Sequence, residues 1–449
     1  MSRKQVLLRG TFILTTSGIL SRIMGFFYRI FLSRTFGAEN VGLYQLILPV
    51  LTLCFSISTA GIETAVSRTV GSRSSTFADS TQWQKKKESI NILFSGILCS
   101  LIFSFLCIFI IIQNSNFIAD TILGDKRCEF LLKLIVFTLP FSAIHNCIAG
   151  FYYGQKFAKI PALCQLLEQT ARISTVFLLY FIYTQNNLTF SLSAAVIGLI
   201  AGESVSTIFS LYSLKKHVTA FQFHFSDLFS VRCVKELISL SFPLTLNRIL
   251  INLLQGIEAV SIPAQLQKYN LTSSEALSIY GILNGMALPC ILFPSAITTS
   301  AASLLMPTIA EIQATENRSK IAGITKKSCS LCFLLGLFCC FLFLISGQWI
   351  GNTLFHEKTA GDFILTLAWI CPFLYTNTAL QSIINGLGKT KLTLFINMLG
   401  LSVRILSVYF IIPLFGIKGY LWGLLASQFI ICTTSIFIIC IFHQKSSTL

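Results

Sequence analysis

The chain has 449 residues, of which 54% are hydrophobic and only 11% are charged, and its formal net charge is +16. No stretch between its apolar segments is longer than about 30 residues, which leaves no room for a sizeable soluble domain. The five histidines and 15 cysteines lack the spacing of a metal site or a catalytic triad. We therefore expect no enzyme activity, no cofactor and no metal ion.

About twelve apolar segments follow one another along the chain. A helix needs about 20 apolar residues to cross the core of a bilayer, so these segments predict an all-α polytopic membrane protein with about 12 transmembrane helices. The predicted helices are residues 8–32, 41–66, 90–112, 130–153, 160–183, 190–213, 236–260, 277–302, 329–347, 362–385, 392–413 and 417–441.

Lysine and arginine are concentrated in alternate loops. One set of loops and termini holds 21 basic residues, whereas the other set holds six. Loops rich in these residues remain in the cytoplasm, so the distribution predicts that both termini are cytoplasmic. It also explains the net charge without a nucleic acid as partner; the expected surroundings are membrane lipids.

The two halves of the chain resemble each other. An offset of 232 residues aligns Gly154 with Gly386 and Arg172 with Arg404 without a gap. Each match alone is weak, but further matches follow in the same order at nearly the same offset. This agreement indicates an internal duplication.

The duplication suggests a domain organisation. We expect an N-lobe of six helices over residues 1–213, a cytoplasmic linker over 214–235 and a C-lobe of six helices over 236–449. Each half has an even number of crossings, so both enter the membrane in the same sense, as in transporters built from parallel repeats. Alternating access would come from rocking one lobe against the other around a central cavity.

Charged residues inside the apolar segments point to that cavity. A charge at the bilayer centre costs from about 2.5 to over 10 kcal/mol, so these side chains are expected to face a polar interior. On the first helix and on the corresponding helix of the second half, polar residues recur every three or four positions and share one helix face. The predicted cavity residues are Arg22, Gly25, Arg29, Arg248, Asn252, Gln255 and Glu258.

Other ionisable residues within the segments are secondary cavity or coupling candidates, and several have alternative roles. Arg29 could extend to lipid headgroups. Glu168 and Arg172 have the spacing of an ion pair within one helix, and Arg404 could bind a neighbouring helix. The secondary candidates are Glu63, Glu168, Arg172, Glu203 and Arg404.

Two features concern the second half. Pro289 and Pro294 make the eighth helix the hinge candidate, because proline in a helix interior removes a hydrogen bond and favours a bend. Asn377, Gln381 and Asn385 form a polar stripe in the tenth helix. This stripe could contact a ligand or make hydrogen bonds between helices.

Several stretches resemble a known family. The stretch from Ser21 to Phe26 (SRIMGF) and the residues Phe36-Gly37-Ala38 and Val41 to Gln45 (VGLYQ) resemble the start of the stage V sporulation protein B group. The similarity continues along essentially the whole chain. This group belongs to the polysaccharide-exporter branch of the superfamily that also holds MATE drug exporters and lipid II flippases.

The resemblance implies a V-shaped, MATE-like bundle in the bacterial cytoplasmic membrane. It implies the flipping of an undecaprenyl-pyrophosphate-linked saccharide, lipid II or a related precursor, to the outer leaflet, for spore cortex or cell-envelope synthesis, with a cell-wall synthase as a possible partner. Arg22 matches the flippase arginine near the lipid pyrophosphate. Two further motif positions of the lipid II flippases fall on Tyr28 and Arg29 here, and this departure favours the sporulation group.

The alternative is a cation-coupled multidrug exporter of the MATE type. Arginines in the cavity would repel a cationic drug, whereas the carboxylates of Glu63, Glu203 and Glu258 would suit one and could carry protons.

Overall fold

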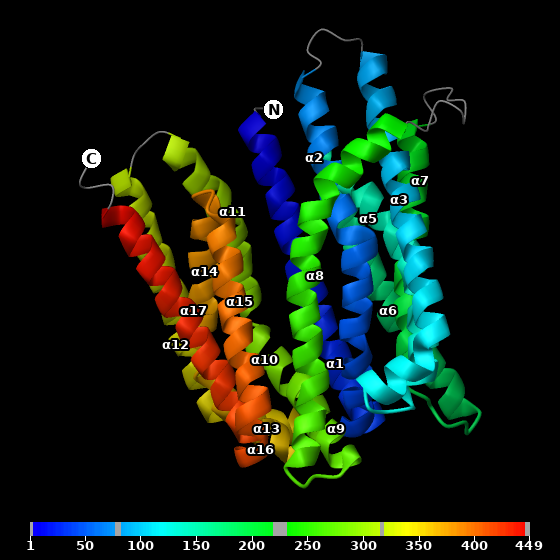
Figure 1. The fold of residues 1–449 in the computed structure, drawn as a ribbon, viewed down its shortest axis with the longest axis vertical. Helices are drawn as coiled ribbons and strands as arrows, with labels where there is room; N and C mark the ends of the chain where they lie inside the picture. Colours follow the sequence, from blue (N-terminus) through cyan, green and yellow to red (C-terminus); the bar gives the residue numbers. More distant parts are fainter. Residues whose placement is uncertain (1–2, 77–81, 219–230, 315–317, 445–449) are drawn as a thin grey trace. The chain divides into compact units, whose positions relative to one another are not determined.

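A computed structural model of the chain describes residues 3–76, 82–218, 231–314 and 318–444 (Figure 1). These residues form helices joined by short turns and include no strand. The predicted all-α fold class is confirmed. The helices divide into two compact units, each of which combines segments that are distant in sequence.

Unit 1 comprises Met1–Gly25 and Leu46–Gly256. It contains both ends of the first helix and the first part of α8. Its elements are α1 (Arg3–Phe55, shared with unit 2), η1 (Ser56–Ala60), α2 (Gly61–Thr76), α3 (Gln82–Phe117), η2 (Ile118–Ile122), α4 (Cys128–Ile135), α5 (Thr138–Gly154), α6 (Lys159–Gln185), α7 (Ser193–Val218) and α8 (Val231–Lys268, shared with unit 2).

Unit 2 comprises Phe26–Gln45 and Ile257–Leu449. Besides its parts of α1 and α8, its elements are α9 (Ser273–Gly281), η4 (Ile282–Ala287), α10 (Leu288–Leu292), α11 (Ser295–Ala314), α12 (Arg318–Trp349), η5 (Ile350–Phe355), α13 (Lys358–Ala368), α14 (Cys371–Gly386), α15 (Thr390–Leu406), η6 (Ser407–Ile411), α16 (Ile412–Phe415) and α17 (Ile417–Gln444).

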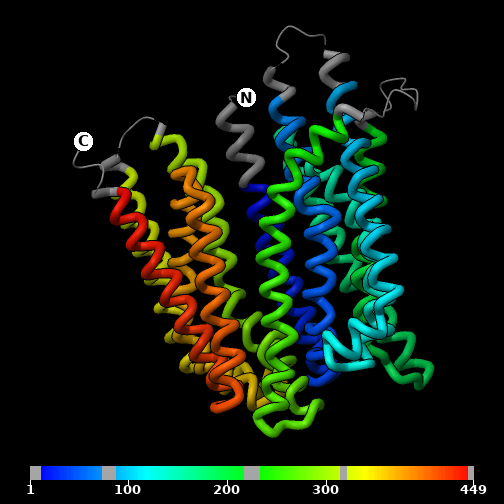
Figure 2. The backbone as a smooth tube through the Cα atoms, viewed as in Figure 1, coloured from blue at the N-terminus to red at the C-terminus, as the bar shows by residue number. Residues whose placement is uncertain are grey.

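The helices pair in the same way within each unit, as the backbone trace in Figure 2 lets the reader follow. In unit 1, α5 packs against α2, α3 and α7, and α6 packs against α7. In unit 2, α14 packs against α11, α12 and α17, and α15 packs against α17. Since the offset of 232 residues superimposes α5 on α14, this correspondence supports the duplication inferred from the sequence.

Among the described residues, nine helical stretches are long and apolar enough to cross a membrane, or ten if the bent pair α13 and α14 counts as one more. The first, Phe12–Ser72, has 61 residues and covers two predicted helices; Gly37, with a positive φ of 74°, breaks it. α6 falls outside this set because Glu168, Arg172 and other polar residues lower its hydropathy. Every one of the twelve predicted segments overlaps a helix.

Three predicted helices are broken in the structure, and proline marks each break. The segment 130–153 divides into α4 and α5, and 362–385 divides into α13 and α14, which are bent by 56°. In α5 and α14, Pro140 and Pro372 occupy the first turn, where the missing N–H is tolerated. The segment 277–302 is interrupted at Phe293 and Pro294, between α10 and α11.

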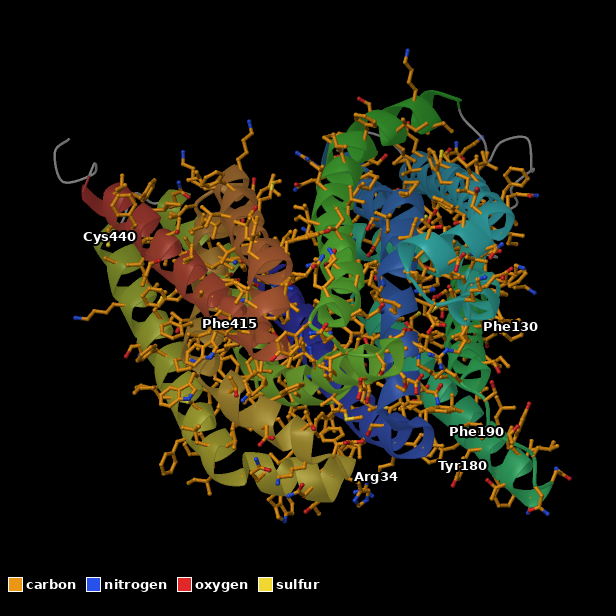
Figure 3. All side chains as sticks on the ribbon, turned by 60° about the horizontal axis from the view of Figure 1, so that its bottom comes forward. Arg34, Phe130, Tyr180, Phe190, Phe415 and Cys440 are labelled. Atoms are coloured by element: carbon orange, nitrogen blue, oxygen red, sulfur yellow. The ribbon has the colours of Figure 1, made fainter. Side chains whose placement is uncertain are left out.

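Contacts within unit 2 hold residues 26–45 against the rest of that unit. Gly281 of α9 approaches α1 so closely that a Cβ atom there would lie 2.1 Å from the carbonyl oxygen of Ala38. Arg34 (Figure 3) donates from Nε to the carbonyl oxygen of Leu354 at 2.7 Å and from Nη2 to that of Thr353 at 2.5 Å. Arg34 thus satisfies carbonyl groups at the end of η5 that lack helical partners.

The predicted linker 214–235 lies between the end of α7 and the start of α8, and its residues 219–230 lie outside the described residues. Close to the turn between α6 and α7, Tyr180 and Phe190 pack edge to face with ring centroids 5.4 Å apart (Figure 3). The lobe boundaries 1–213 and 236–449 and the cytoplasmic location of the termini stay predictions.

Candidate functional site

The polar stripe of α1 lies on an exposed side of that helix. Arg22 and Arg29 are exposed, whereas Ser21 and Tyr28 beside them are buried. Gly25, between the two arginines, is half-buried, and no atom lies within 4 Å of the position that a Cβ would occupy. A charged side chain against lipid is costly, so this face is suited to a polar space.

The corresponding stripe of α8 divides between two environments. Within unit 1, Asn252 donates a short hydrogen bond from Nδ2 to Oγ of Ser56, and Arg248 donates from Nη2 to Oγ1 of Thr64 at 3.4 Å. Arg248 and the neighbouring Gln255 are exposed. The stripe therefore offers one guanidinium and one amide at the surface of unit 1, where α8 packs on η1 and α2.

Glu258, the last residue of that stripe, is buried in unit 2 and is paired with Arg404 of α15. Nε of Arg404 donates to Oε1 at 2.6 Å and Nη2 donates to Oε2 at 2.5 Å, a bidentate geometry typical of strong charge-assisted bonds. Oη of Tyr420, on α17, donates to Oε1 at 2.7 Å. Glu258 is only 2% exposed, so this triad connects three helices inside the unit.

Amide side chains also connect helices within unit 2. Asn377 donates from Nδ2 to the carbonyl oxygen and to Oε1 of Gln428 at 3.0 and 2.9 Å. Gln381 donates from Nε2 to Oδ1 of Asn397 at 2.8 Å. The stripe on the tenth predicted helix thus makes hydrogen bonds to α15 and α17, one of the two roles that the sequence left open.

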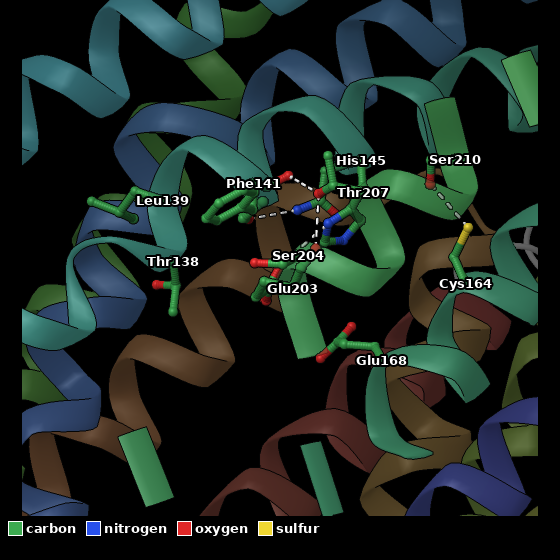
Figure 4. A network of polar contacts seen from close by, with 12 residues as sticks. Thr138, Leu139, Phe141, His145, Cys164, Glu168, Glu203, Ser204, Thr207 and Ser210 are labelled. Atoms are coloured by element: carbon green, nitrogen blue, oxygen red, sulfur yellow. Dashed lines mark hydrogen bonds and ion pairs between the residues drawn. The ribbon is translucent and has the colours of Figure 1, made fainter. Parts of the chain in front are cut away.

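A second group of charged residues lies inside unit 1 (Figure 4). Glu168 and Arg172 form the ion pair expected from their spacing on α6, with Nη2 and Oε1 2.5 Å apart. Nδ1 of His145, on α5, lies 3.2 Å from Oε2 of Glu203, on α7. Glu63 of α2 lies close enough to His145 to interact with it electrostatically.

Sequence reasoning missed His145, because its partners lie on other helices and its own helix carries no further charge. The position of His145 in a mostly apolar helix could have indicated it, since a polar ring buried in such a segment needs a hydrogen-bond partner. The equivalent arginines of the two repeats also differ in a way that the alignment did not reveal. Arg172 pairs within its own helix, whereas Arg404 pairs with Glu258 of α8.

An apolar groove of about 820 Å³ lies on unit 2 along α15, η6, α16 and α17. Its walls are almost entirely apolar, and one cation, Lys418, stands among them. Residues that line it include Leu406, Phe410, Phe415 (Figure 3) and Trp422. Among the residues that the structure describes, no group of three or more His, Cys, Asp and Glu side chains could hold a metal ion.

Comparisons with known proteins agree with this architecture. Residues 7–313 match the family described as polysaccharide biosynthesis protein. The chain is 27% identical over 423 residues to stage V sporulation protein B of Bacillus subtilis (strain 168), which covers 93% of this chain and 80% of that protein. It is 23% identical over 437 residues to the lipid II flippase MurJ of the same organism, and this match covers 89% of this chain and 76% of that protein.

Solved structures show the same fold at low sequence identity. An inward-facing multidrug resistance MATE transporter of the MOP superfamily superimposes with a TM-score of 0.78 at 12% identity, covering 98% of this chain and 99% of that chain. The lipid II flippase MurJ in an inward closed conformation gives a TM-score of 0.71 at 12% identity, covering 95% and 87%.

The fold defines the class: a multi-pass protein of a bacterial membrane with the architecture of the MOP superfamily transporters. The family match spans more than half of the sequence, so the chain belongs to the polysaccharide biosynthesis protein family. The resemblance noted from SRIMGF and VGLYQ is confirmed.

Proposed function

We propose that this protein is a flippase that moves an undecaprenyl-pyrophosphate-linked saccharide, lipid II or a related precursor, to the outer leaflet by alternating access. The observation that carries the proposal is the exposed pair Arg22 and Arg29 within the membrane-spanning stretch of α1, in a member of the polysaccharide biosynthesis protein family. Guanidinium groups bind phosphate oxygens in a bidentate manner. These two arginines would therefore contact the pyrophosphate.

Further residues support a lipid-linked substrate. Within unit 1, Arg248, Asn252 and Gln255 supply polar contacts of the kind that saccharide hydroxyls need, and within unit 2 the groove beside Lys418 is apolar, as an isoprenoid chain requires. The interruption at Pro294 supports a bend in the helix that follows η4. A spore cortex or cell-envelope role, and a cell-wall synthase as partner, are part of the same proposal.

The test is flipping of fluorescent lipid II in proteoliposomes by the purified protein. We expect the parent protein to flip it, Arg22→Ala to abolish flipping, and Arg22→Lys to restore only part, because an ammonium group cannot bind two oxygens in the same planar geometry. Arg68→Ala, at another exposed arginine, is the matched control. Full activity of Arg22→Ala and Arg29→Ala would contradict the proposed pyrophosphate contact.

A cation-coupled multidrug exporter is the second candidate, and the carboxylates of Glu63 and Glu203 inside unit 1 favour it. The same proteoliposomes, loaded with ethidium, discriminate between the two functions. Ethidium transport without lipid II flipping would replace the first proposal with the second.

A further inference from the structure

Unit 1 holds an imidazole and a carboxylate that face each other in an apolar interior (Figure 4). His145 and Glu203 are each 7% exposed, and Nδ1 and Oε2 are 3.2 Å apart. Neither atom makes a hydrogen bond to any other described residue. Each of the two groups is therefore the nearest partner that the other has for a proton.

The helix contacts around the pair set its geometry. Oγ1 of Thr207 donates to the carbonyl oxygens of Phe141 and Glu203, both at 2.8 Å, and so joins α7 to α5 one turn from the pair. Gly202 lets α6 approach: a Cβ atom there would lie 2.8 Å from the carbonyl oxygen of Glu168. A single methyl group at Gly202 would push the charged residues of α6 away from Glu203.

The other charges that face the pair come from three helices. α6 contributes Glu168 and Arg172, which neutralise each other. α2 contributes Glu63, and α8 contributes Arg248, which interacts electrostatically with Glu63. From α3, Cys99 lies in the same buried cluster as Cys147 of α5, and Ser100 donates to the carbonyl oxygen of Ser58; neither carries a formal charge as thiol or hydroxyl.

Charge balance then depends on the His145 and Glu203 pair. Glu168 has Arg172 as its ion-pair partner, and among the described residues the ion-pair partner of Glu203 is His145. Without a proton, the pair carries one uncompensated negative charge in an apolar core, which is costly. With one proton, held on either group, the pair is neutral overall. The interior therefore favours one bound proton, and exposure of the pair to water removes that preference.

The geometry suits a proton better than a metal cation. A carboxylate and an imidazole at hydrogen-bonding distance share a proton, and histidine changes its charge in the physiological pH range. No set of three metal-ligating side chains exists among the described residues. One carboxylate and one imidazole would leave a metal ion largely uncoordinated.

We propose that His145 and Glu203 together form a proton-binding site through which proton movement is coupled to transport. This inference rests on the proposed transport function. The proton enters from water on one side of the membrane, is shared between Nδ1 and Oε2 while the site is enclosed, and leaves to water on the other side. No covalent bond is broken, and one proton is bound and released in each cycle.

Proton binding itself is measured first, without any substrate, by nitrogen-15 NMR of histidine-labelled protein in nanodiscs across a pH series. The His145 signal is assigned by its loss in His145→Gln. In Glu203→Gln the protonation midpoint of His145 should shift relative to the parent, whereas His356→Gln, at an exposed histidine of unit 2, should leave it unchanged. An identical His145 titration in the parent and in Glu203→Gln would overturn the proton site, whether or not the protein flips lipid II.

Coupling is measured second, in proteoliposomes with an imposed pH gradient. A gradient of one pH unit can bias the outer-to-inner ratio of labelled lipid by at most about tenfold for one proton per cycle. We expect this bias in the parent and in His356→Gln, and its loss in both His145→Gln and Glu203→Gln with downhill flipping retained. Melting curves and size-exclusion profiles show whether each variant is folded. A pH response that persists in both folded variants would overturn the coupling, whereas absence of flipping in the parent would refute only the proposed function.

Discussion

The triad of Glu258, Arg404 and Tyr420 predicts a strong dependence of stability on Arg404. In Arg404→Ala the carboxylate of Glu258, whose side chain is 3% exposed, loses two hydrogen bonds and its compensating charge. Removing one partner of a buried ion pair costs about 3–5 kcal/mol. The Arg404 side chain is 25% exposed, so water relieves part of this cost, and we expect the free energy of unfolding to fall by about 3 kcal/mol.

Two further variants test the reasoning. Tyr420→Phe removes one hydrogen bond to a charged group and should cost about 1.5 kcal/mol. The double variant Glu258→Met/Arg404→Met replaces the pair by apolar side chains of similar length. It should regain most of the loss and lie within about 1 kcal/mol of the parent, because no buried charge remains.

The assay is equilibrium unfolding of the purified protein in mixed micelles, followed by tryptophan fluorescence. Lys391→Ala, an exposed change on the same helix α15, is the control and should lie within about 0.5 kcal/mol of the parent. A cost of Arg404→Ala below about 1 kcal/mol would refute the assignment of a buried, structurally important pair. The assignment would also be refuted if the double variant Glu258→Met/Arg404→Met were less stable than the single variant Arg404→Ala.

Two other predictions concern the contacts that fasten residues 26–45 to the rest of unit 2. Gly281→Ala should destabilise the protein by about 1–3 kcal/mol, because its methyl group would collide with the backbone of Ala38; the control Gly323→Ala, with open space around it, should be neutral or stabilising in the same unfolding assay. Arg34→Ala should cost about 1–2 kcal/mol and speed hydrogen exchange in η5, since it removes two hydrogen bonds to carbonyl groups of that segment. Unchanged exchange at residues 350–356 in Arg34→Ala would show that Arg34 does not hold η5.

Much of the fold was predictable from the sequence because it depends on local composition. Apolar runs of about twenty residues specify membrane helices regardless of what surrounds them. The matches at a constant offset anticipated that equivalent helices pack against one another within each of the two units. The breaks at Val136 and Trp369 were missed, since a hydropathy pattern does not register where a helix bends. The interruption at Phe293 lies in the eighth predicted helix, where Pro289 and Pro294 had suggested a bend. Proline was present at or near each break but is also tolerated within continuous helical segments, as Pro49 and Pro307 show.

The candidate site was less predictable, because the residues that pair with one another in it are distant in sequence. Glu258 and Arg404 are separated by 146 residues, and the sequence assigned them to separate groups. His145 was passed over since Glu203, its partner, lies on another helix. The pair of Glu168 and Arg172 was anticipated, because helix geometry alone brings residues four positions apart together.

The π-helical segment η1 sets how α2 is rotated relative to α1. A π-turn arises when one residue is inserted into an α-helix, and each α-helical residue advances the rotation by about 100°. Deleting one residue from Ser56–Ala60 would restore a regular helix and turn all of α2 by that angle relative to α1. Glu63 would then leave its place beside Gly150, where its carbonyl oxygen lies 2.5 Å from the position of a Cβ. The extra residue of η1 thus sets the rotation that holds Glu63 of α2 against α5.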